Sequence, residues 1–179
     1  MVDPLTLERW IYRSVFCLWA AVFAVVMILP LETRPGRLPG PEWMLCLTFA
    51  WLQRRPDFVP AWLIAGVFLS LDMLLMRPPG LMTAFVLLGS EFLRSRQYGT
   101  GEMTFGTEWL TAAAAIVAVF LCDGLVLGLF AVPEADFGRQ VVQAVLTVLA
   151  YPFIAALSHY GFRVQRQTPG TLSARGMIR

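Results

Sequence analysis

Long apolar blocks alternate with short polar segments along the whole chain. Four blocks come close to the ~20 residues that a helix needs to cross the ~30 Å hydrocarbon layer of a bilayer; they are 10–29, 58–76, 109–131 and 141–160. Two further blocks, 43–52 and 81–93, are shorter and fit an interfacial segment as well as a span. The pattern predicts an all-α, polytopic integral membrane helix bundle with six transmembrane helices, or with four or five if the short blocks do not cross.

Composition and charge placement agree with a membrane location. Hydrophobic residues make up 58% of the chain and charged residues 15%, against about 45–50% and about 25% in soluble domains. The 14 basic residues are all arginines. Six spans put ten of them on the side of both termini and four on the other side, whereas four spans give nine and five. Because cytoplasmic loops collect arginine, the sequence predicts that the N- and C-termini are cytoplasmic.

The domain organisation follows from the same pattern. We expect residues 1–162 to form a single transmembrane helical domain. Residues 163–179 carry four arginines and no apolar periodicity, so we expect a basic, disordered cytoplasmic tail that faces anionic lipid.

Two acids interrupt the apolar blocks. Asp72 stands in VFLSLDMLLM and Asp123 in VFLCDGLVLG. A charged residue inside a span costs about 2.5–3.5 kcal/mol at the helix centre and normally faces a partner within the protein. Arg77, after a short turn, is the predicted partner of Asp72. The acids read either as structural contacts that orient helices or as a proton or ion site, and the scarcity of other polar groups in these blocks favours the structural reading.

Small residues adjoin both acids. Gly124 and Gly128 form a GxxxG pattern, which lets another helix approach closely, and Gly66 and Ser70 precede Asp72 in the same block. Pro152 should kink the last helix and free backbone carbonyls. We therefore predict helix or partner contacts at these residues. On the cytoplasmic side the candidates for contact are Arg54, Arg55, Glu91 and Arg94, the last two as an interfacial ion pair.

The chain offers little to other kinds of chemistry. Its one histidine, His159, is expected at the end of the bundle opposite the two acids, so a Ser–His–Asp set would have to bridge the bilayer. The three cysteines match no metal-ligand spacing. No Gly-rich phosphate loop is present. We therefore expect no catalytic activity, no metal, no cofactor and no binding of nucleic acid.

The segment PEWMLCLTFAWLQRRPDFVPAWLIAGVFLSLDMLLMRPPG resembles the central part of the MreD family, the multi-span rod shape-determining proteins of bacteria. The shared features are a Pro before a short apolar helix, a basic turn, a helix with Gly and a late Asp, and a turn containing Gly; here they are Pro41, Arg54, Arg55, Gly66, Asp72 and Gly80. Asp123 and Pro152 also look like the family. One departure is the compact turn MRPPG, where many members carry a longer loop.

The resemblance implies a non-catalytic scaffold in the bacterial inner (cytoplasmic) membrane. Such a scaffold belongs to the elongation complex that builds lateral peptidoglycan, and it pairs with MreC. Through MreC it contacts the actin-like MreB, the glycosyltransferase RodA and a penicillin-binding transpeptidase. The six-helix fold of the MreD family is also said to resemble the substrate-binding subunits of vitamin importers. A small transporter or such a subunit, using Asp72 or Asp123, is the alternative function.

Overall fold

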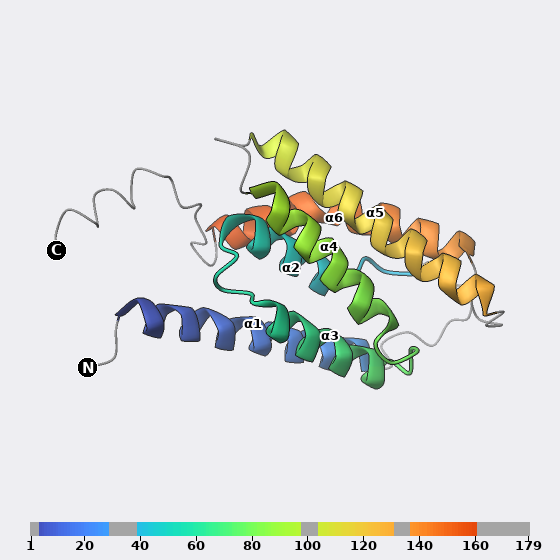
Figure 1. Cartoon of the computed structure of the whole chain (residues 1–179), viewed down its shortest axis with the longest axis horizontal. Coiled ribbons are helices and arrows are strands. Elements are labelled where there is room, and N and C mark those ends of the chain that lie inside the picture. The colour runs from blue at the N-terminus through green and yellow to red at the C-terminus, as the bar shows by residue number, and fades with distance from the viewer. Residues whose placement is uncertain (1–3, 29–38, 98–103, 131–136, 161–179) are drawn as a thin grey trace.

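Six helices make up the computed structural model, which describes residues 4–28, 39–97, 104–130 and 137–160 (Figure 1). In chain order they are α1 Pro4–Ile28, α2 Trp43–Arg54, α3 Ala61–Leu74, α4 Leu81–Gln97, α5 Phe105–Leu129 and α6 Phe137–Tyr160. The described part contains no strand, so the predicted all-α class is confirmed. The predicted basic tail lies outside the described residues.

Successive helices run in opposite directions, so the start of α1 and the end of α6 lie at the same end of the bundle (Figure 1). We call this end the basic end, because six arginines of the described helices and connections gather there: Arg9, Arg13, Arg54, Arg55, Arg94 and Arg96. The opposite end holds the beginnings of α2, α4 and α6. It carries Glu42, Asp72 and Asp123, and we call it the acidic end.

Among the described helices, three are long and apolar enough to cross a membrane; the candidate spans are Thr6–Met27, Phe105–Leu129 and Phe137–Ser158. The predicted long span at 58–76 is wrong in its length, because α3 has only 14 residues, or about 21 Å of helix. Pro60 precedes its first residue in an extended conformation. After Leu74 the chain turns through Met76, at φ 55°, towards Pro78, and the residue before a proline disfavours helix.

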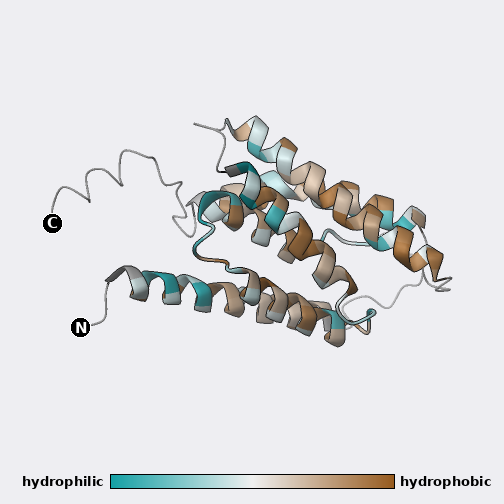
Figure 2. Ribbon diagram, viewed as in Figure 1, coloured by the Kyte–Doolittle hydropathy of each residue, from teal (hydrophilic) through white to brown (hydrophobic). Residues whose placement is uncertain are grey.

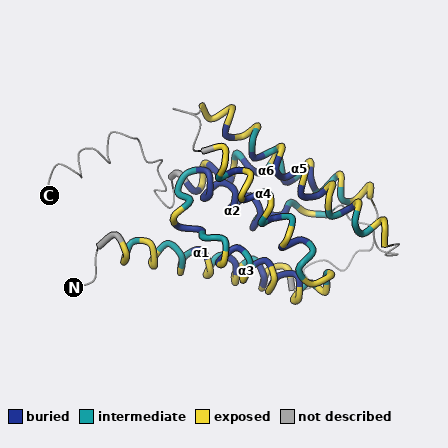
Figure 3. The backbone as a smooth tube through the Cα atoms, in the orientation of Figure 1, coloured by how far each residue is buried: buried dark blue, intermediate teal, exposed yellow. Residues whose placement is uncertain are grey.

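The short helix α2 forms the centre of the molecule. Ten consecutive residues, Met44 to Gln53, are buried, and the helix lies among α1, α4, α5 and α6 (Figure 3). A helix of 12 residues is about 18 Å long, too short to cross a bilayer alone. Because protein surrounds it, α2 does not need to match the thickness of the lipid.

Helix α1 lies at the edge of the bundle beside α3. Its buried apolar residues Phe16, Ala20 and Ala24 recur every fourth position and so form one narrow stripe. Tyr12, Val15, Trp19 and Phe23 are partly buried against the core, and the outward side of α1 is exposed and largely apolar, as is the outer face of α5 (Figure 2). Exposed apolar helix faces are the arrangement expected where lipid is the solvent.

Candidate functional site

Asp72 caps the first turn of α4. It is 1% exposed, and its Oδ2 accepts hydrogen bonds from the backbone N–H of Gly80 (3.1 Å), the N–H of Thr83 (3.2 Å) and the Thr83 hydroxyl (2.8 Å). The first N–H groups of a helix have no partner within that helix. A carboxylate from the end of α3 thus supplies acceptors to α4 and fastens the two antiparallel helices together.

The predicted pairing of Asp72 with Arg77 is wrong. The Arg77 guanidinium donates instead to Oε2 of Glu42, at 3.3 Å, and Glu42 is 2% exposed. Gln143 of α6 donates to the same oxygen at 3.2 Å, and the backbone N–H of Glu42 donates to the Thr147 hydroxyl at 3.0 Å. Glu42 therefore joins the start of α2 to α6 and to the α3–α4 turn.

Asp123 is half-buried on α5 and meets α6 through Gln140, whose amide nitrogen lies 3.4 Å from Oδ2. The adjacent Gly124 lies against the same glutamine. A Cβ at Gly124 would lie 2.1 Å from Oε1 of Gln140, at the far end of a flexible side chain, so an added methyl group would displace that amide. Gly124 therefore faces a side chain of α6 in this chain, and its role in a close helix approach stays a prediction.

The acidic end holds these charges close enough to act on one another. Asp123 interacts electrostatically with Arg77, Asp72 and Glu42. One arginine therefore faces three carboxylates, and the remaining stabilisation comes from neutral donors, namely the backbone of α4 and the amides of Gln140 and Gln143. The two acids that the sequence singled out do lie at one end of the bundle, as predicted.

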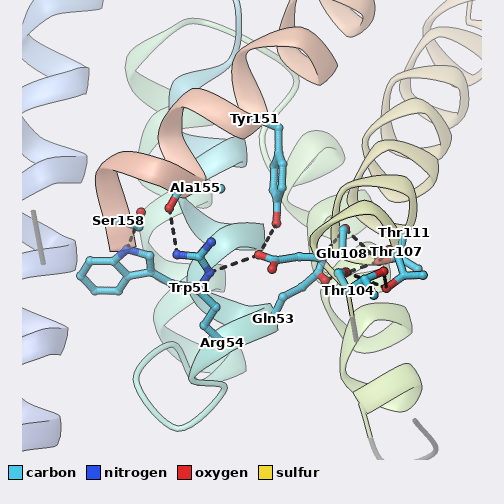
Figure 4. Close-up of polar contacts among 10 residues, drawn as sticks. All are labelled: Trp51, Gln53, Arg54, Thr104, Thr107, Glu108, Thr111, Tyr151, Ala155 and Ser158. Atoms are coloured by element: carbon cyan, nitrogen blue, oxygen red, sulfur yellow. Dashed lines mark hydrogen bonds and ion pairs between the residues drawn. The ribbon is translucent and has the colours of Figure 1, made fainter. Parts of the chain in front are cut away.

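A second buried polar cluster lies at the basic end (Figure 4). Glu108, 3% exposed, receives the Nε–H of Arg54 at 3.2 Å and the Tyr151 hydroxyl at 3.4 Å on the same carboxylate oxygen. Arg54 also donates to the carbonyl of Ala155 at 2.8 Å. Side chains from α2, α5 and α6 thus meet in one network, which connects the central helix to α5 and α6.

Glu108 stands one residue before the predicted apolar block 109–131. Glu108 lies in the first turn of α5, and its carbonyl accepts from the Gln53 side chain at 3.0 Å. A carboxylate near a helix N-terminus is favoured by the helix dipole. The dipeptide Thr107–Glu108 directly before an apolar block was the available signal. Arg54, predicted as a surface contact, is instead largely buried against Glu108.

Pro152 lies inside α6, as predicted, and its consequence is visible on α5. A proline has no N–H, so the carbonyl four residues earlier loses its helical donor. That carbonyl belongs to Val148, and it accepts the indole N–H of Trp109 at 3.1 Å. The predicted freeing of a backbone carbonyl is therefore confirmed, and the freed group ties α6 to α5.

The other predicted contact residues divide into two groups. Glu91 and Arg94 form the predicted ion pair, at 3.5 Å. Gly66, Ser70 and Gly128 are exposed, and a Cβ added at either glycine would meet nothing within 4 Å. Asp72 is buried, whereas Gly66 and Ser70 are exposed on α3, so no described helix packs on the two small residues and a partner contact there stays a prediction.

The described residues hold no group of three or more His, Cys, Asp or Glu side chains arranged to bind a metal ion. What the two clusters do is hold helices together: each buried carboxylate receives donors from at least one other helix or turn. Comparison of the chain with models of known protein families, with curated proteins and with solved structures finds no significant match. The function is therefore inferred from the contacts of the described residues.

Proposed function

We propose that this chain is a non-catalytic scaffold of the bacterial inner membrane that docks the transmembrane helix of a partner protein. In this proposal it spans the membrane six times, with both termini in the cytoplasm. The gathering of arginines at the end that holds the start of α1 and the end of α6 supports this orientation, because cytoplasmic loops are rich in arginine.

The observation that carries the proposal is the uncovered small-residue surface of α3. Gly66 has no heavy atom of another helix within 4 Å of where its Cβ would be, and the Ser70 hydroxyl is turned back onto the Gly66 carbonyl at 2.7 Å. Trp62, Leu69 and Met73 beside them are exposed. Small residues on a membrane helix let a second backbone approach closely, and the described residues leave this surface open.

The buried polar clusters support the same role. The carboxylates of Asp72, Glu42 and Glu108 bind donors within the chain. These contacts hold the five helices from α2 through α6 in a fixed arrangement. A scaffold needs such a body, because a docking surface that shifts would cost ordering free energy at each encounter.

The resemblance to MreD suggests the partner. We infer that the docking helix is that of MreC, a protein with a single membrane span, and that this chain joins the elongation complex through it. RodA, the penicillin-binding transpeptidase and MreB would be reached through MreC. Lateral peptidoglycan synthesis would then be the process served.

A co-purification assay with MreC tests the proposal. Gly66→Leu and Ser70→Leu place bulk on an open surface, so the bundle should fold normally while MreC recovery falls at least about tenfold, as expected when close helix packing is blocked. Ala114→Leu, on the exposed face of α5, is the matched control and should retain MreC. Full recovery of MreC with both α3 variants would refute docking at this surface.

A second candidate function, transport or substrate binding, rests on Asp123. This carboxylate is half-buried and has one long hydrogen bond, from Gln140, whereas Asp72 is fully engaged in capping α4. Ligand-dependent thermal shifts in detergent test this alternative. A shift with a cation or vitamin that Asp123→Asn abolishes would favour transport over scaffolding.

A further inference from the structure

The basic end carries arginines whose hydrogen-bond donors the chain leaves unused. Arg9 and Arg13 are four residues apart and therefore lie on one face of α1. Arg9 is exposed and has no partner among the described residues. Arg13 donates to the carbonyl of Asp57 at 3.3 Å, and its Nε is buried without an acceptor in the described ranges. A guanidinium has five N–H donors, so the donors of Arg9 and the other terminal N–H groups of Arg13 remain for a ligand.

Arg13 is held between two exposed indoles. Its guanidinium carbon lies 5.5 Å from the ring centroid of Trp10 and 5.7 Å from that of Trp62. Trp10 is 55% exposed and Trp62 is 59% exposed. Exposed tryptophans beside an arginine are typical of the layer where lipid head groups meet hydrocarbon, which places the Arg13 guanidinium at head-group depth.

The connection between α2 and α3 completes a corner with α1. Phe58 stacks on Tyr12 of α1, with ring centroids 4.3 Å apart. Arg55 also lies over the Phe58 ring, with its guanidinium carbon 5.2 Å from the ring centroid. Arg13 binds the carbonyl of the neighbouring Asp57. Arg13 and Arg55 therefore flank the same two residues of the connection.

The corner has a net positive charge. At the basic end, Arg54 and Arg94 are paired with Glu108 and Glu91. Within the corner itself, Arg9, Arg13 and Arg55 stand against Glu8 and Asp57, which leaves an excess of one positive charge. Anions are therefore attracted here in preference to cations or neutral groups.

We propose that the corner between α1 and the α2–α3 connection binds the head group of an anionic phospholipid. The lipid phosphate contacts Arg9 and Arg13 beside Arg55, and its acyl chains lie against the exposed indole side chains of Trp10 and Trp62, which flank Arg13. A soluble acidic peptide would match the charge but would leave these apolar side chains uncovered. Basic pockets between helices at a membrane surface bind anionic head groups in this way.

Native mass spectrometry of the full chain, with phosphatidylglycerol or phosphatidylcholine added to the micelles, tests the inference. Phosphatidylglycerol should bind more tightly, and Arg9→Gln and Arg13→Gln should each weaken that binding about fivefold, as expected for loss of one basic residue at a membrane surface. Arg139→Gln removes an exposed arginine at the acidic end and should leave the binding unchanged. Arg9 has no contacts within the described chain, so its variant should fold normally.

Three results would overturn the assignment. The first is equal binding of the two lipids by the unaltered chain. The second is a loss with Arg139→Gln as large as the loss with Arg9→Gln, which would indicate a diffuse charge effect. The third is a glutamate-rich peptide that binds as tightly as phosphatidylglycerol and loses its binding in the same variants, which would indicate a protein-docking surface.

Discussion

Removal of the Asp72 carboxylate should destabilise the contact between α3 and α4. Asp72→Ala takes away the acceptor of three donors, namely the N–H groups of Gly80 and Thr83 and the Thr83 hydroxyl. The Gly80 bond is part-buried, and the hydroxyl can rotate to another acceptor. The Thr83 N–H is buried and would stay unpaired, which costs about 1–3 kcal/mol. Loss of the negative charge at the start of α4 adds about 0.3–1 kcal/mol.

Together these contributions give an expected loss of roughly 1–4 kcal/mol in the free energy of unfolding. Asp72→Asn keeps an oxygen that can accept the same bonds, so it should lose only the charge contribution, about 1 kcal/mol or less. Equilibrium unfolding in mixed micelles with increasing denaturing detergent measures the difference. Amide hydrogen exchange supplies a local readout, because exchange at 80–84 should accelerate in the alanine variant and change little in the asparagine variant.

An exposed acid provides the control for this experiment. Asp57→Ala removes a carboxylate of the α2–α3 connection that is exposed, and it should change the stability by no more than about 0.5 kcal/mol. The reasoning is refuted if Asp72→Asn destabilises as much as Asp72→Ala, since the charge and not the hydrogen bonds would then carry the effect. It is also refuted if the alanine variant unfolds like the unaltered chain.

Three further variants test the other interhelical contacts by the same unfolding measurement. Glu108→Gln leaves a buried arginine without its counter-charge and should cost about 3–5 kcal/mol; a loss under 1 kcal/mol would contradict the network. Gly124→Ala should displace the end of the Gln140 side chain and break its hydrogen bond to Asp123, at a cost of about 0.5–1.5 kcal/mol, whereas in a Gln140→Ala background the same change should cost almost nothing. Trp109→Phe should cost about 1 kcal/mol but almost nothing in a Pro152→Ala background, where the restored N–H satisfies the carbonyl; equal losses in both backgrounds would show that the indole bond is unimportant.

The sequence predicts those features that depend on local pattern. Apolar blocks separated by turn residues identify all six helices, because a chain with this pattern can satisfy its backbone in lipid only as helices. The effects of Pro152 and Gly124 also follow from covalent structure: one lacks an N–H and the other lacks a Cβ, wherever the neighbouring helix lies. The ends of α3 were less predictable, because an apolar side chain next to Pro60 or Met76 says little about the backbone.

The acids at the block edges were less predictable still. Glu42 and Glu108 each stand at the boundary between a polar segment and an apolar block, where a solvent-exposed acid and a buried one have the same sequence surroundings. Their burial depends on α6, which contributes Gln143 to Glu42 and Tyr151 to Glu108 from about 100 and 43 residues away. No sequence pattern within either block predicts these contacts with α6.

The prediction that Arg77 pairs with Asp72 failed for a physical reason, which concerns charged groups in apolar surroundings. Nearness in sequence favours Arg77, and opposite charge makes that pairing attractive, but a carboxylate in a membrane also needs several directional donors to replace lost water. The turn after α3, with Gly80 at φ 86°, brings the unpaired N–H groups of the next helix onto Asp72. Arg77 therefore pairs with Glu42, which stands before the first residue of α2 and has no other cationic partner among the described residues. Asp72 thus receives the N–H groups at the start of α4, and Glu42 receives Arg77 and Gln143. If Asp72 paired with Arg77 instead, the first turn of α4 would be left without an acceptor.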